Sequence, residues 1–313
     1  MLWKRLGLSL TIIGAALVPL VCGTPAQAQA SRTWVSGVGD DANPCSRTAP
    51  CKTFAGAISK TAVDGQIDCL DPGGFGAVTI TKSITIDCHE VFGSVLVSGT
   101  NGIVINSDSA ANVRLRNLNF TGLASGINGI LIQGTVAANT VVILQDLWID
   151  DFTQRGISDT RSNGGKLLIS NTTINNSGGA GIGLIPSSGT TRTDVVLDQV
   201  YVRNSNIGLQ TGGSATVMVS RSVFSGNTNS GIEVDGPFSG VSVDNSVSSS
   251  NGTGVTANAG TNVRLSNSAI MFNNTGITGT TQSFTNNRIA GNNNPGTAPT
   301  VIPPNPSNPT GQQ

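Results

Sequence analysis

Three stretches of the sequence decide the fold: VILQDLWI (142–149), LLISNTTI (167–174) and VVLDQVYV (195–202). In each stretch, apolar and polar residues alternate up to a polar residue at the fifth position, and then alternate again. The same pattern recurs in VRLRNLNF (113–120), VMVSRSVF (217–224), VSVDNSVS (241–248), VRLSNSAI (263–270) and SFTNNRI (283–289). Alternation with a period of two indicates β-strands, and a repeat of roughly twenty to thirty residues indicates a solenoid.

If each repeat forms one coil, equivalent apolar residues stack in columns at the ~4.8 Å spacing of neighbouring strands. The first and third residues of the stretches form two such columns, which contain Val113, Val142, Leu167, Val195, Val217, Val241 and Val263, and then Leu115, Leu144, Ile169, Leu197, Val219, Val243 and Leu265. A propeller would need about four strands in ~40–45 residues. The observed steps of 19 to 29 residues leave room for only two or three.

The fifth position of the stretches is polar throughout: Asn117, Asp146, Asn171, Gln199, Arg221, Asn245, Asn267 and Asn286. Asparagine suits a tight bend, because it tolerates left-handed dihedral angles and its side chain bonds nearby backbone. Stacked Asn side chains also bond one another as ladders. We therefore predict turn chemistry at these positions, not ligand binding.

The N-terminus, residues 1–30, has the pattern of a secretory signal peptide. Lys4 and Arg5 precede an apolar stretch, and small-x-small cleavage sites end at Ala28 and Ala30. A lipoprotein anchor at Cys22 is the alternative, but the residues before it are not small. No later segment approaches the ~20 apolar residues of a membrane span. The sequence thus predicts a secreted or periplasmic protein without a membrane span.

The charge of the chain argues against nucleic acid as a partner. Removing two basic residues with the signal peptide leaves a net charge of −2, and only 11% of residues are charged. Nucleic-acid binding needs clustered Lys and Arg, which the sequence lacks.

The segment WVSGVGDDANPCSRTAPCKTFAGAIS (34–59), followed by DGQIDCLDPGGFGAVTITKSITIDC (64–88), resembles the N-terminal entry of right-handed parallel β-helix proteins of the pectate-lyase-like superfamily. The resemblance implies an all-β, single-stranded right-handed parallel β-helix of roughly ten coils. It also implies a strand at Trp34–Ser36, a short N-terminal capping helix at Thr53–Ala62 and a first coil strand at Ile67–Leu70.

With the repeats, the resemblance divides the chain into four regions. The signal peptide is followed by the strand, disulfide loop and capping helix at 31–64, by the β-helix at 65–292, and by a Pro-rich tail at 293–313. Ser246, Ser248, Ser268 and Asn287 occupy positions that are apolar in earlier repeats, so we expect the last coils to be the least stable.

Where relatives usually carry Gly and an aromatic residue, this chain carries Cys45 and Cys51. The chain has four cysteines after the signal peptide, an even number that suits an oxidising compartment. We favour the pairs Cys45–Cys51 and Cys69–Cys88. The second pair depends on register: if Cys69 faces Ile86, then Cys88 is displaced by two residues and the Cα separation could exceed ~7 Å. In the alternative, Cys69 is a small buried hydrophobic residue.

The resemblance includes polysaccharide lyases and glycosidases, but the Asn-Thr-Asp, Gly-His-Gly and Arg-x-Lys motifs of polygalacturonase-like relatives are missing. The only histidine, His89, lies in a turn near the capped end. Stacking is expected to bring Asp150 near Asn175 and Arg203. If the protein is an enzyme, the candidates are therefore Asp150, Asp151, Arg155, Asp198 and Arg203. A solvated surface with ordinary ion pairs explains the same residues, and we expect no metal and no cofactor.

A different feature favours binding. Four consecutive repeats place an apolar residue at an outward position: Ile143, Leu168, Val196 and Met218. Together they predict a stripe ~15 Å long, with Trp148 and Tyr201 at its rim. Exposed apolar patches are usually covered by something, either the loop 186–193 or a partner.

The sequence therefore predicts a secreted non-catalytic scaffold that binds an extracellular glycan or a cell-surface protein along its outer face. The alternative is a polysaccharide lyase or glycoside hydrolase that acts on an extracellular polysaccharide. Neither the ligand nor the oligomeric state follows from the sequence.

Overall fold

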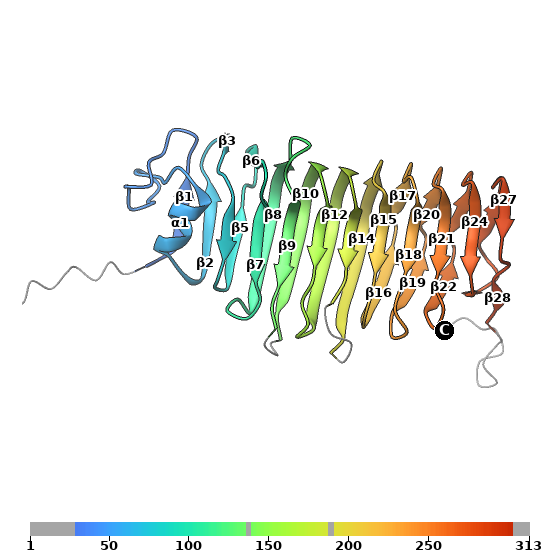
Figure 1. Cartoon of the computed structure of the whole chain (residues 1–313). Helices are drawn as coiled ribbons and strands as arrows, with labels where there is room; N and C mark the ends of the chain where they lie inside the picture. Colours follow the sequence, from blue (N-terminus) through green and yellow to red (C-terminus); the bar gives the residue numbers. More distant parts are fainter. Residues whose placement is uncertain (1–28, 136–138, 187–190, 303–313) are drawn as a thin grey trace, which may run out of the picture.

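A computed structural model describes residues 29–135, 139–186 and 191–302 of the chain. The described residues form one rod of stacked coils, with the N-terminal region at one end and the last strands at the other (Figure 1). Most of the predicted signal peptide, residues 1–28, lies outside the described residues, as does the end of the predicted Pro-rich tail.

The rod is a right-handed parallel β-helix, which confirms the predicted fold class. Its coils stack as two parallel sheets of 18 and 10 strands. The rod makes about eight turns, slightly fewer than the roughly ten expected.

The strands of the ten-stranded sheet stack in chain order along the rod. Its members are β4 (Val78–Ile80), β7 (Ile103–Asn106), β9 (Asn128–Gln133), β11 (Arg155–Asp159), β13 (Ala180–Leu184), β15 (Ile207–Thr211), β18 (Ser230–Val234), β21 (Thr253–Ala257), β24 (Thr275–Gly279) and β27 (Asn294–Gly296).

The 18-stranded sheet bends around a corner, and in the middle of the rod one long strand per coil passes through it. These long strands are β8 (Asn112–Thr121), β10 (Val141–Phe152), β12 (Gly165–Ser177) and β14 (Thr193–Arg203). The other members are β1 (Ala30–Val35), β2 (Thr61–Cys69), β3 (Gly73–Gly74), β5 (Ile84–Asp87), β6 (Gly93–Leu96), β16 (Ala215–Ser220), β17 (Val223–Ser225), β19 (Gly240–Asp244), β20 (Val247–Ser249), β22 (Asn262–Ser266), β23 (Ala269–Met271), β25 (Thr281–Ser283), β26 (Arg288–Ala290) and β28 (Thr300–Val301).

The corner lies at the fifth position of the repeats, as the sequence predicts. Seven of its eight residues have a left-handed backbone, with φ between 45° and 56°, from Asn117 to Asn267. In the last repeat Thr285, not Asn286, has the positive φ. Adjacent side chains form a ladder at several steps; for example, Asn171 Nδ2 donates to Asp146 Oδ1 at 2.5 Å. We call the outward side chains before this corner the first wall, and those after it the second wall.

The predicted apolar columns are buried and in register. Val142 faces Leu167, and Leu144 faces Ile169; these side chains are at most 1% exposed. The Gly-Ile pairs of the ten-stranded sheet have a steric reason. A Cβ atom on Gly156 would lie 2.5 Å from Ile174 Cγ2 and 2.8 Å from the carbonyl oxygen of Gly181, so only glycine fits where the chain turns back toward the core.

At the N-terminal end, the helix α1 (Phe54–Lys60) covers the first coil. It is shorter than the predicted Thr53–Ala62, because Thr53 is the N-cap and strand β2 begins at Thr61. Phe54 packs on Phe75 with ring centroids 5.2 Å apart. The cap therefore closes the core at this end of the rod.

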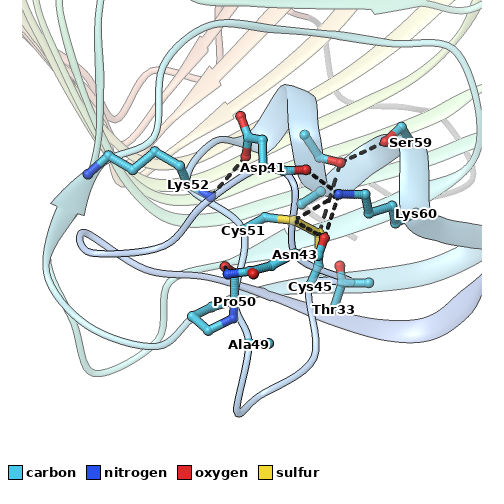
Figure 2. Close-up of a disulfide and its surroundings, with 12 residues drawn as sticks. Thr33, Asp41, Asn43, Cys45, Ala49, Pro50, Cys51, Lys52, Ser59 and Lys60 are labelled. Carbon is cyan, nitrogen blue, oxygen red and sulfur yellow. Dashed lines mark hydrogen bonds between the residues drawn. A yellow bond between two sulfur atoms is a disulfide. The ribbon is translucent and has the colours of Figure 1, made fainter.

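The loop before α1 is closed by the predicted Cys45–Cys51 disulfide (Figure 2). Lys60 Nζ donates to the carbonyl oxygen of Asn43 at 2.5 Å, which ties the end of the helix to this loop. Asp41 accepts bonds from the backbone N–H of Thr53 and from its hydroxyl, at 2.9 and 2.7 Å. The disulfide loop and the helix thus form one structural unit.

The second predicted disulfide, Cys69–Cys88, is also present, with Cα atoms 4.6 Å apart. The register considered from the sequence, with Cys69 opposite Ile86, is wrong. Ile67 faces Ile86 and Asp68 faces Asp87, so the next pair of residues is Cys69 and Cys88. The bridge therefore joins two adjacent coils directly.

At the C-terminal end, the coils continue past residue 292, where the sequence analysis placed the start of the tail. Strand β27 pairs with β24, and β28 pairs with β25. Pro295 is tolerated in β27 because this strand lies at the edge of its sheet, where a missing N–H costs little. Residues 293–302 are therefore part of the rod.

Candidate binding surface

The first wall carries the apolar stripe formed by Ile143, Leu168, Val196 and Met218. Each residue of the stripe faces the next across neighbouring strands. Leu168, Val196 and Met218 are 38%, 43% and 40% exposed, while Ile143 is half-buried. Because three of the four side chains are this exposed, the described parts of the loop 186–193 do not cover them; residues 187–190 lie outside the described part of the chain.

A hollow of about 240 Å³ adjoins the stripe toward the N-terminal end. Ile143 is shared by both, and the remaining lining comes from Asp64, Ile84, Thr85, Asn112, Val113, Arg114 and Val141. Next to the other end of the stripe, the outward residues become polar and then basic, at Ser242 and Arg264. The apolar surface is thus bounded by polar groups at both ends.

The second wall presents two aromatic rings. Trp148 faces Thr173, and Thr173 faces Tyr201 in the following coil. Trp148 is 44% exposed and Tyr201 is 38% exposed. Because the residue between them is short, both rings stand on the surface in a single column. The corner residues separate them from the stripe, so the two features belong to different walls.

The polar row beside these rings follows the predicted stacking. Asp150 faces Asn175, and Asn175 faces Arg203. Burial raises the pKa of Asp150, and the charge of neighbouring Asp151 raises it further. Within the described ranges, neither Asp150 nor Arg203 forms an ion pair. Their polar atoms are therefore available to a ligand.

The remaining candidate residues lie on other surfaces. Asp151 stands at a second corner with φ of 69° and accepts a bond from Asn176 Nδ2 at 2.8 Å. Asp198 lies on the first wall, where it accepts a bond from Ser220 Oγ at 2.8 Å and pairs with Arg221. These bonds are those of turns and surface ladders.

Arg155 lies on the ten-stranded sheet, away from both walls. Its side chain crosses the face of Gly183, and Nη2 donates to Gln210 Oε1 at 3.5 Å. Burial lowers the pKa of its guanidinium. The five residues named as catalytic candidates are therefore spread over the two walls, a corner and the opposite sheet.

Sequence reasoning missed a buried ion pair at the edge of the core. Arg161 is 0% exposed and Asp159 is 2% exposed, and Arg161 Nη2 donates to Asp159 Oδ2 at 2.6 Å. Asp159 occupies a column that holds Ile132 and Leu184 in the neighbouring coils. An aspartate between two apolar neighbours of its column, Ile132 and Leu184, was the signal that could have found the pair.

In the ranges that the structure describes, no group of three or more His, Cys, Asp and Glu residues is placed to hold a metal ion. Among the same residues, no helix is long and apolar enough to cross a membrane.

The fold and its repeat define the class of protein as a right-handed β-helix. The model of the family described as "Right handed beta helix region" matches residues 128–294, which is more than half of the chain. The chain belongs to this family. No curated protein sequence matches the chain.

Among solved structures, the chain is similar to pectate lyase Pel9A, at 15% identity and a TM-score of 0.47, over 88% of this chain and 80% of that one. A rhamnogalacturonan lyase is similar at 14% identity and a TM-score of 0.44, over 77% and 74% of the two chains. The A-module of the Azotobacter vinelandii mannuronan C-5 epimerase AlgE6 is similar at 11% identity and a TM-score of 0.39, over 77% and 91%. At these identities the likeness concerns the fold alone.

Proposed function

We propose that this protein is an exported, non-catalytic scaffold that binds a glycan or a cell-surface protein along the outer face of its rod. The observation that carries the proposal is the apolar stripe of the first wall. A soluble rod gains nothing from exposing Leu168, Val196 and Met218 side by side, and contiguous apolar surface of this kind usually marks a site that a ligand covers.

The spread of the catalytic candidates supports binding over catalysis. A glycosidase needs two carboxyl groups ~5–9.5 Å apart on either side of the scissile bond. Here Asp198 and Asp150 stand on different walls, and Asp151 and Asp198 are held in hydrogen bonds with neighbouring coils. Two disulfides are typical of proteins that function outside the reducing cytoplasm.

The alternative, a polysaccharide lyase or glycoside hydrolase, has one observation in its favour. The pKa of Asp150 is raised by burial and by Asp151, and raised carboxyl pKa values occur in general acids. If the protein is an enzyme, we expect Asp150 to be the group that matters.

The test uses the double variant Leu168→Ser with Val196→Ser. We expect it to lose retention on immobilised glycans, or association with the surface partner, by about tenfold or more, because two buried contacts of ~1–2 kcal/mol are removed. The matched control is Val38→Ser with Val63→Ser, which changes two residues that are 91% and 60% exposed at the capped end of the rod.

Equal retention by the stripe variant and the control would contradict the proposal. The same samples are incubated with polysaccharides with and without Ca²⁺, while ultraviolet absorbance reports unsaturated products and a reducing-sugar assay reports hydrolysis. Product formation by the wild type that is lost in Asp150→Asn would favour the enzyme.

A further inference from the structure

The two rings of the second wall have a regular spacing. Trp148, Thr173 and Tyr201 occupy one column in three successive coils. Two coil steps of ~4.8 Å place the rings roughly 10 Å apart along the rod axis. Since Thr173 is short and half-buried, nothing in the column blocks a flat ligand that touches both rings.

A polar row runs parallel to the rings, with one residue in each coil. Asp150 supplies hydrogen-bond acceptors, Arg203 supplies donors, and Asn175 between them supplies both. The row faces outward because it lies two residues beyond the ring column in each strand. Hydroxyl groups at the edge of a ligand on the rings would therefore meet a polar partner at every coil.

The charge of the row selects against strongly charged ligands. A polyanion would be attracted by Arg203 and repelled by Asp150. A polycation would be attracted by Asp150 and repelled by Arg203. Neither residue is neutralised by an ion pair in the described chain. A neutral chain rich in hydroxyl groups uses all three side chains without such a conflict.

We propose that the second wall binds an extended, neutral β-1,4-linked polysaccharide that lies along the rod axis, with alternate sugar rings stacked on Trp148 and Tyr201. This inference rests on the proposed function, names the class of glycan and places that glycan on the second wall, across the corner from the stripe. In a β-1,4-linked chain successive sugars are turned over, so that every second ring presents the same face. The length of that two-sugar repeat is close to two coil steps, or about 10 Å.

Stacking on Trp and Tyr suits a sugar because the ring face is apolar while its edge carries hydroxyl groups. Trp and Tyr combine a large apolar face with a polar tip, and they supply this contact with little loss of side-chain freedom. An α-1,4-linked chain coils, so its rings do not follow a straight column of this spacing. The geometry therefore discriminates between two ligands with the same sugar.

The experiment measures binding of cellohexaose and maltohexaose to the wild-type protein and to Trp148→Ala, Tyr201→Ala and the double variant by titration calorimetry. We expect the wild type to bind cellohexaose at least about tenfold more tightly than maltohexaose. Each single variant should weaken cellohexaose binding by about threefold to tenfold, which is the range of one aromatic contact. Trp148→Phe and Tyr201→Phe keep a ring and should restore most of the binding.

The matched control is Phe238→Ala, which removes an exposed ring outside the second wall and should leave binding unchanged. Equal affinity for the two oligosaccharides, or full binding by the double variant, would overturn the inference.

The inference and the proposed function fail differently. If glycan retention is lost in the Leu168/Val196 variant but unchanged in the Trp148/Tyr201 variant, the proposed stacking on the second wall is overturned and binding through the stripe is supported. A wild type that retains none of the glycans overturns the inference, whereas association with a surface protein through the stripe would still support the proposed function.

Discussion

The early and late coils of the rod fill the same interior positions with opposite chemistry. Just after the first corner, the early coils place Leu118 and Leu147 in the core, whereas the late coils place Ser222, Ser246 and Ser268 there, at most 3% exposed. After the second corner, Phe152 of the early coils gives way to Asn227, Asn251 and Asn273 in the late ones, at most 4% exposed. The backbone path is the same in both halves.

The late coils can bury these polar groups because equivalent residues in neighbouring coils form hydrogen bonds with one another. Asn227 Nδ2 donates to Asn251 Oδ1, and Asn251 Nδ2 donates to Asn273 Oδ1, both at 3.0 Å. Each serine hydroxyl donates within its own coil and accepts a backbone N–H from the coil before, as Ser246 does at 2.7 and 3.0 Å. A polar residue is thus stable inside a solenoid when every coil supplies the partner of the next.

The largest expected effect is that of Asn251→Ala, in the middle of the Asn ladder. The change removes the acceptor of the backbone N–H and of the Nδ2 group of Asn227 inside the core, and one donor to the carbonyl of Phe224. We expect the free energy of unfolding to fall by about 4 kcal/mol, because each orphaned buried group costs ~1–3 kcal/mol. Urea denaturation measures it.

The control for the ladder is Asn258→Ala, which removes an exposed bond to Asp235 and should cost less than about 0.5 kcal/mol. If the two variants are equally stable, the ladder contributes no more than a surface bond, and the comparison between the two halves fails.

The second prediction tests the early half of the rod through its Cys69–Cys88 disulfide. Replacing both Cys69 and Cys88 by Ser opens a link between residues 19 apart in the sequence. We expect a loss of about 3 kcal/mol, since a bridge of this span restricts the unfolded chain by that amount. The reduced wild type, which also loses the Cys45–Cys51 bridge, should be at least as destabilised as the variant. Unchanged stability in the variant would show that stacking alone holds the first coils.

A smaller effect sharpens the account of the serine column. Ser246→Ala should cost about 1.5 kcal/mol, because the N–H of Ser222 loses its acceptor. The triple change of Ser222, Ser246 and Ser268 to Ala should cost less than three times as much, because neighbouring sites that share partners are not additive. A fully additive triple variant would mean that the serines act independently.

The smallest effect concerns pH at the capped end. Partial burial raises the pKa of Asp41, but bonds from Thr53 and Lys52 and the charge of Lys60 outweigh it and leave the pKa below its usual value. The carboxylate therefore stabilises the fold above the unfolded pKa of about 3.9, and this contribution is lost as pH falls through the lower folded value.

We expect Asp41→Asn to cost at most about 0.5 kcal/mol at pH 7, because the group is largely exposed. The difference from the wild type should shrink steadily when stability is measured below pH 4. A difference that grows on acidification would contradict the assigned sign.

Much of the fold could be predicted because the repeat carries it. Val142, Leu167 and Val195 recur at the same place in each stretch, and only stacking in register buries all of them. The left-handed corner followed from the recurrent Asn, and the outward stripe followed from the alternation. The expected weakness of the late coils rested on counting serines as lost apolar contacts, which leaves out the bonds that these serines make to each other.

Less of the candidate surface could be predicted. The alignment of Asp150, Asn175 and Arg203 follows from counting residues after the corner. The separation of Asp198 and Arg155 from this row does not follow from counting residues, because it depends on how far each bend turns the chain. The register of Cys69 with Cys88 likewise depends on how the first coil leaves helix α1, for which no earlier repeat sets the phase.

By itself, the sequence determined that the chain coils, which residues form the core columns, and which outward positions share a column. These are local properties, fixed by the alternation of side chains along a strand and by repetition between strands. The tertiary structure alone decided which columns share a surface and which buried polar groups find partners, because both depend on the directions of the bends and on contacts between residues of different coils.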